Sequence, residues 1–136
     1  MVLPTGQILV AGVEVYNGPG TYQASWQPTI TSCPTTVTPG STYSISGTQF
    51  NGLSQANAFG DEYQTATNYP LVRITNSSTG HVFYAKTHGH STMGVATGSE
   101  TVSTNFDVSS ATETGPSTLA VVANGIPSAP FNITVQ

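Results

Sequence analysis

The chain has 136 residues, which is enough for one ordinary domain or for one domain with a short fragment of another. Charged residues make up only 6% of the chain, against about 25% in a typical soluble domain, and the net charge is −4. Because Arg73 and Lys86 are the only fixed cations and no apolar run approaches about 18 residues, we expect neither a nucleic-acid surface nor a membrane span.

The remaining composition is typical of an all-β domain. Ser and Thr supply 37 positions, whereas the residues that favour long helices, Glu, Lys, Arg and Leu, are scarce. Cys33 is the only cysteine, so no intrachain disulfide can form. The first six residues lack the basic segment, apolar core and cleavage site of a signal peptide. We therefore expect an all-β piece of a longer, exported protein.

The predicted strands fall into two groups along the chain. Two short β-rich runs, 7–11 and 13–16, precede a turn cluster at 17–20. From Thr29 onward, alternating apolar residues and turn signals such as Asn124-Gly125 separate further strands. There are seven of these, at residues 29–32, 42–47, 69–75, 81–86, 101–108, 117–123 and 131–135. Seven short strands in about 100 residues predict an immunoglobulin-like β-sandwich, since a closed barrel would need longer strands.

The apolar residues of these strands predict the core. The candidates for the core or its edge are Trp26, Tyr43, Ile45, Leu71, Val82, Tyr84, Phe106, Leu119, Val121 and Ile133. The segment 50–68 has no clear periodicity, and its length favours a functional loop or a hidden helical turn. We expect the two N-terminal strands to pair with an edge of the sandwich or with a second copy, because unpaired strands expose backbone groups.

Short motifs along nearly the whole chain resemble a known family. Residues 3–12 resemble the inner strand of a kelch propeller blade, and residues 13–17 resemble the strand after it. The rest resembles the C-terminal early-set domain that follows the propeller in galactose oxidase and glyoxal oxidase relatives, through motifs at 26–30, 39–47, 71–73, 87–88 and 119–128. The resemblance implies a blade remnant and linker at 1–28 and an early-set immunoglobulin-like sandwich at 29–136.

The resemblance also implies a metal ligand. In the family's copper radical oxidases, a histidine in a Thr-His pair on this domain ligates copper, and His88 is the matching residue. His90 would share a face with His88 if the segment were extended, and imidazole suits copper or zinc. The other ligands of that family belong to the propeller, so we expect no cofactor and no catalysis in this chain alone. Copper at His88 and His90 stays an open alternative.

Loop aromatics point to a second kind of site. Trp26, Tyr63 and Tyr69 lie in or beside loops, where a flat ring could stack on a sugar, although Trp26 could instead fill a seam with the propeller. Asp61 and Glu62 are adjacent loop carboxylates that could help to bind calcium or could simply be solvated.

The favoured interpretation is a non-catalytic structural or binding module of an exported, bacterial kelch protein, secreted, periplasmic or on the cell surface, and carbohydrate-associated. Self-association through the exposed propeller-facing surface is a further expectation. The alternatives are a carbohydrate-binding module proper and a copper-binding domain with His88 as ligand.

Overall fold

Strands dominate the parts of the chain that the computed structural model describes, which are residues 3–10, 14–18, 20–53 and 69–136. Two short strands, β1 (Ile8–Val10) and β2 (Glu14–Tyr16), precede a single 3₁₀ turn, η1 (Ala24–Trp26). The strands that follow are β3 (Thr29–Ser32), β4 (Thr36–Val37), β5 (Thr42–Thr48), β6 (Leu71–Asn76), β7 (Val82–His88), β8 (Val102–Asp107), β9 (Gly115–Ala123), β10 (Ile126–Pro127) and β11 (Phe131–Val135).

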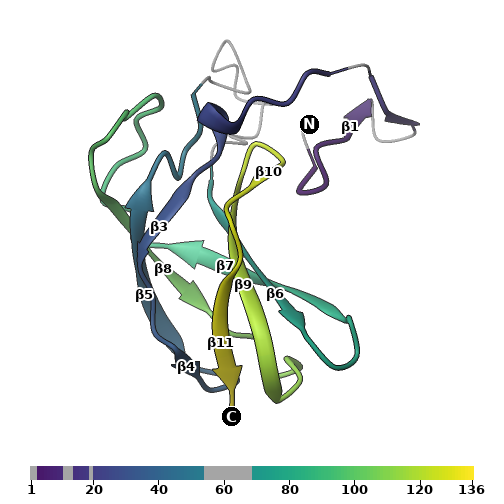
Figure 1. Cartoon of the computed structure of the whole chain (residues 1–136), viewed down its shortest axis with the longest axis vertical. Coiled ribbons are helices and arrows are strands. Elements are labelled where there is room, and N and C mark those ends of the chain that lie inside the picture. The colour runs from purple at the N-terminus through teal and green to yellow at the C-terminus, as the bar shows by residue number, and fades with distance from the viewer. Residues whose placement is uncertain (1–2, 11–13, 19, 54–68) are drawn as a thin grey trace.

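The strands from β3 onward form two layers that are joined through β7 (Figure 1). The hydrogen-bonded order is β3-β5-β8-β7-β6-β9-β11-β4, and β10 pairs with β9. The first half of β7, Val82 to Ala85, pairs with β6, while its second half, Lys86 to His88, pairs with β8. β7 therefore crosses from one layer to the other and closes one side of the sandwich.

This arrangement confirms the predicted all-β, immunoglobulin-like sandwich. All seven strands expected from Thr29 onward are present, with the short β4 and β10 in addition. The paired strands of the two layers are antiparallel except for β4, which runs parallel to the last strand, β11. The Asn124-Gly125 turn between β9 and β10 has the two positive φ values, 49° and 80°, of a primed hairpin turn.

Residues of both layers point inward by strand alternation and build one core. On β8, Val102, Thr104 and Phe106 are buried, and the Phe106 ring lies 5.9 Å from that of Tyr43 on the neighbouring β5. Burial of each such aliphatic or aromatic side chain stabilises the fold by about 1.5–3 kcal/mol. The core residues are Val37, Ile45, Phe50, Val72, Ile74, Ala85, Val102, Phe106, Val108, Leu119, Val121, Ile133 and Val135.

The predicted inward face of β7 is wrong. Val82 and Tyr84 are 49% and 41% exposed, whereas Ala85 and Thr87 are buried. Both faces of this strand carry apolar side chains, so alternation alone does not tell which face points inward. The pairing of Val72 with Ala85 decides the outcome, because Val72 on β6 is fully buried.

The other core candidates divide by burial. Ile45, Phe106, Leu119, Val121 and Ile133 are buried, as predicted. Trp26, Tyr43 and Leu71 are half-buried at the edge of the sandwich.

The two N-terminal strands pair with each other. Ile8, Leu9 and Val10 lie opposite Tyr16, Val15 and Glu14 in an antiparallel ribbon that forms a separate sheet. The expectation that they pair with an edge of the sandwich is therefore wrong, because each strand already takes its partner locally. The adjoining turn meets the sandwich at Gly125, where an added Cβ would lie 2.4 Å from the Cα of Gly6. Glycine is thus required for this close approach.

The described residues contain no helix that is long and apolar enough to span a bilayer. Most of the predicted loop at 50–68, including Phe59, Asp61, Glu62 and Tyr63, lies outside the described residues. Phe50 and Asn51 are described, and both are buried at the end of the sandwich.

The exposed face of β7 gives a stability test. Phe106→Ala should lower the free energy of unfolding by about 3–5 kcal/mol, because it empties a fully buried site. Val82→Ala should lower it by less than about 1 kcal/mol, because the side chain is half in solvent. Urea denaturation of both variants checks this, and a loss at Val82 as large as that at Phe106 would contradict the observed inward face of β7.

Candidate functional site

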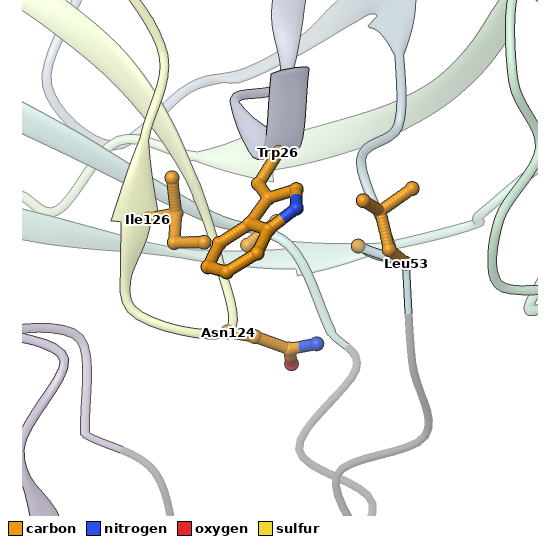
Figure 2. A pocket seen from close by; sticks show the side chains of 6 residues that line it. Trp26, Leu53, Asn124 and Ile126 are labelled. Atoms are coloured by element: carbon orange, nitrogen blue, oxygen red, sulfur yellow. The ribbon is translucent and has the colours of Figure 1, made fainter. Parts of the chain in front are cut away.

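A hollow of about 320 Å³ lies beside Trp26, close to β10 at the end of the sandwich (Figure 2). Figure 2 shows the indole of Trp26 between Ile126 and Leu53, with the side chain of Asn124 opposite. Gly52 and Ala123 complete the lining. The volume is at the lower end of the range of about 300–1,000 Å³ that small-molecule pockets occupy.

Hydrogen bonds from two glutamines hold Trp26 at this end. Gln27 follows η1 and donates from Nε2 to the carbonyl oxygen of Pro127 on β10 at 2.9 Å. Gln49 donates from Nε2 to the carbonyl oxygen of Ser25 within η1 at 3.4 Å. The indole is half-buried, so part of the ring stays accessible from the hollow. These contacts tie residues that are far apart in sequence and fix the ring against β10.

Two tight turns build the opposite wall. Gly52 has a φ of 73°, and an added Cβ there would lie 2.6 Å from Nδ2 of Asn124, so the two turns touch at a position that only glycine fits. The buried Asn51 anchors its turn by donating from Nδ2 to the carbonyl oxygens of Thr92 and Gly94, at 2.8 and 3.1 Å. The wall is therefore held by backbone geometry as well as by packing.

A second, more open hollow of about 590 Å³ lies beside the first. It shares Trp26, Asn124 and Ile126 with the first hollow and extends over Thr21 and the 60%-exposed Tyr22 toward the N-terminal turn. Trp26 thus lines both hollows, and together they form a continuous surface, which we call the Trp26 surface.

The described residues of the Trp26 surface carry no formal charge. Its lining residues are aromatic, aliphatic, glycine, hydroxyl or amide side chains, without a carboxylate, imidazole, thiol or amine among them. An ion would lose hydration there without gaining a countercharge. The surface therefore suits a neutral ligand with an apolar face.

The three aromatic residues expected to bind ligand have different outcomes. Trp26 lines the hollow. Tyr69 is 47% exposed and packs against the ring of His90 with centroids 5.2 Å apart, but it does not line either hollow. Tyr63 lies outside the described residues. Leu53, Asn124 and Ile126 were not predicted as site residues, although the Asn124-Gly125 turn signal did mark the loop that brings two of them to Trp26.

The two histidines expected to bind metal do not share an extended segment. Gly89 between them has a φ of 63°, which turns the chain. His88 is exposed, with its Nε2 atom 3.1 Å from Oδ1 of Asp107. His90 instead turns toward the buried Thr104, with its Nδ1 atom 2.9 Å from Oγ1. The expectation that both rings point to one face assumed an extended segment, and that assumption is wrong.

The hydrogen bonds around Thr104 indicate which nitrogen of His90 carries the proton. Thr104 Oγ1 lies 3.2 Å from the carbonyl oxygen of His88, so it can donate there and accept from Nδ1–H of His90. This assignment leaves Nε2 of His90 as an acceptor, and that atom is buried without a hydrogen-bond partner in the described part of the chain. The imidazoles of His88 and His90 thus contact different neighbours.

The described residues do not by themselves bring three metal ligands together at His88 and His90. The described segments contain no group of three or more His, Cys, Asp or Glu side chains that could hold a metal ion. The pair His88 and His90 would supply two imidazoles at most, since His88 faces Asp107 and His90 faces Thr104. The function that we propose therefore does not involve copper. Copper binding at His88 and His90 stays a prediction.

Comparison with known proteins does not assign the chain to a family. No protein-family model and no curated protein sequence matches the chain.

The pKa values near the histidines follow from their neighbours. Burial lowers the pKa of His90, and the charge of His88 lowers it further. The hydroxyl of Thr42, at 2.7 Å, and the imidazole of His88 lower the pKa of the Asp107 carboxyl. His90 is therefore expected to be neutral at pH 7, while Asp107 is ionised.

The titration of His90 tests this arrangement. Its midpoint, measured by NMR on the imidazole protons, should lie below the ordinary histidine value of about 6.5. His88→Gln should raise the midpoint, because it removes a like charge, whereas His81→Gln should leave it unchanged, because His81 pairs with Glu113 instead. A midpoint at or above 6.5 would contradict the buried position of His90.

The direction of this shift also sets a pH dependence of stability. Since the folded-state pKa of His90 is depressed, the unfolded chain binds the proton more readily, and stability should fall as the pH drops below about 6.5. The variant His90→Gln cannot titrate, so its unfolding free energy should depend less on pH in this range.

Proposed function

We propose that the chain is a non-catalytic binding module and that the Trp26 surface binds a neutral sugar ring. The observation that supports the proposal is the hollow of about 320 Å³ with one accessible indole, whose described lining residues carry no charge. The C–H face of a pyranose is apolar and can stack on an indole, while its hydroxyls need uncharged donors and acceptors.

The lining residues supply both kinds of contact. Trp26, Leu53 and Ile126 offer apolar surface to the ring face. Asn124 places the side chain of a polar, uncharged residue at the wall opposite the indole. Tyr22 and Thr21 extend the surface in the second hollow, which gives room for a further sugar unit of an oligosaccharide.

The same lining favours binding over turnover. Hydrolysis of a glycosidic bond needs a pair of carboxyl groups beside the scissile bond, or a comparable acid and base. Among the described residues that line the two hollows there is no carboxyl, imidazole, thiol or amine group. A sugar held at Trp26 would therefore be bound and released unchanged.

The context we propose is an exported, kelch-type parent protein. Two features support it: the resemblance of residues 3–17 to blade strands, and the exposure of the apolar residues of the ribbon formed by β1 and β2. A module of this kind would hold a secreted or cell-surface protein on a glycan. The low charge of the chain is also common in exported bacterial domains.

Retention on glycans tests the proposal. The full chain should be retained on at least one member of a panel of neutral insoluble glycans, and Trp26→Ala should weaken the binding about tenfold, since aromatic contacts contribute up to about 1.5 kcal/mol. Trp26→Phe, which keeps a ring, should retain most of the binding. Tyr69→Ala is the matched control, because Tyr69 lies outside both hollows and should not matter.

Two results would contradict the proposal. No retention on any neutral glycan would remove the ligand class. Retention that survives Trp26→Ala but is lost in Tyr69→Ala would move the site away from the Trp26 surface.

A further inference from the structure

The two fixed cations of the chain lie at β7, Arg73 across from its first half and Lys86 in the half that pairs with β8. Arg73 on β6 is the register partner of Tyr84 on β7, and Lys86 follows two residues later on the same face of β7. Val82, Tyr84 and Lys86 are exposed, whereas Ala85 between them is buried. A chain with a net charge of −4 thus has both of its fixed cations on or beside β7.

The two cations differ in their neighbours. Lys86 is the register partner of Asp107 on β8, so a carboxylate lies across from it. Arg73 has Tyr84 on one side and Ala120 of β9 on the other, and it is half-buried. The ion pairs found in the described segments do not include Arg73. No acid of the described segments therefore pairs with its guanidinium.

Apolar side chains surround this charge. Leu71 is half-buried, and Val82 and Tyr84 are 49% and 41% exposed. We call the group Leu71, Arg73, Val82 and Tyr84 the Arg73 face. Aromatic residues and arginine are enriched in protein interfaces, and a cation within an apolar patch favours a partner that supplies an acid.

The ribbon of β1 and β2 has the complementary composition. Glu14 lies opposite Val10, and Tyr16 lies opposite Ile8, so these four side chains share one face of the ribbon. Ile8, Val10 and Tyr16 are 41%, 46% and 50% exposed, and Glu14 is exposed with no ion-pair partner in the part of the chain that is described. We call this group the Glu14 face.

We propose that the occupant of the Arg73 face is the Glu14 face of a second copy of this chain. Each face has three apolar side chains and one charge, and the charges are opposite. Glu14 and Arg73 would form an ion pair inside an apolar contact, where screening by salt is reduced. Two copies can exchange this contact reciprocally about a two-fold axis or repeat it from head to tail.

The other described acids are less suited to this role. Asp107 pairs with His88 and lies opposite Lys86, and Glu113 pairs with His81 at 2.7 Å. Glu100 lies in a polar loop rather than among exposed apolar side chains. Glu14 is thus the described acid whose neighbours on the same face are exposed apolar side chains.

Charge reversal tests the pairing. Sedimentation velocity of the full chain over a wide range of concentrations should show self-association, and Arg73→Glu and Glu14→Arg should each weaken it at least tenfold. Glu100→Arg is the matched control, because it makes the same change of charge in an exposed loop and should leave association unchanged. Circular dichroism verifies that each variant is folded.

Mixing the two reversed variants gives the sharpest outcome. Arg73→Glu keeps an intact Glu14 face, and Glu14→Arg keeps an intact Arg73 face, so an equimolar mixture should recover association that neither variant shows alone. A monomeric wild-type chain, association that neither reversal weakens, or a mixture that stays monomeric would each overturn the proposal.

Discussion

The structure depends on the position of β7, whose two halves pair with different layers of the sandwich. Val72 and Ala85 join it to β6, while Thr87 and Phe106 join it to β8. The hydroxyl of Thr87 also donates to the carbonyl oxygen of Pro70, at the start of β6. With its inward residues fixed on both sides, β7 must present its alternate side chains to solvent. The core of the sandwich and its outer face are therefore set by the same register.

The two surfaces for which we propose a function lie on different parts of this sandwich. The Trp26 surface lies at the end of the sandwich, where tight turns at Gly52 and Asn124 replace strand pairing. The Arg73 face lies on the outer surface of β6 and β7. The described lining of the first is concave and without charge, which suits a neutral small ligand. The second is a sheet face whose Arg73 has no ion-pair partner among the described residues, which suits a protein surface. The Trp26 surface and the Arg73 face, for which we propose these two ligands, share no lining residue.

The sequence predicted the strands well because alternation and turn chemistry are local signals. β8 shows its inward face directly in Val102 and Phe106, and Asn124-Gly125 marks the hairpin turn between β9 and β10. The inward face of β7 could not be predicted, since residues 82–85 are apolar on both faces and only pairing with β6 decides between them. The residues that line the Trp26 surface could not be predicted either, because they come from segments about 100 residues apart in the sequence. The two histidines diverge because Gly89 adopts a positive φ, which alternation does not anticipate.

The most direct test of the account is an NMR measurement of the register of β7 in the wild-type chain. Cross-strand backbone NOEs should link Val72 with Ala85 and Thr87 with Phe106 in the same molecule, because β7 serves both layers. NOEs displaced by one residue, linking Val72 with Tyr84, would place Tyr84 in the core and remove the Arg73 face. The absence of any NOE between β7 and β8 would contradict the closure of the sandwich itself.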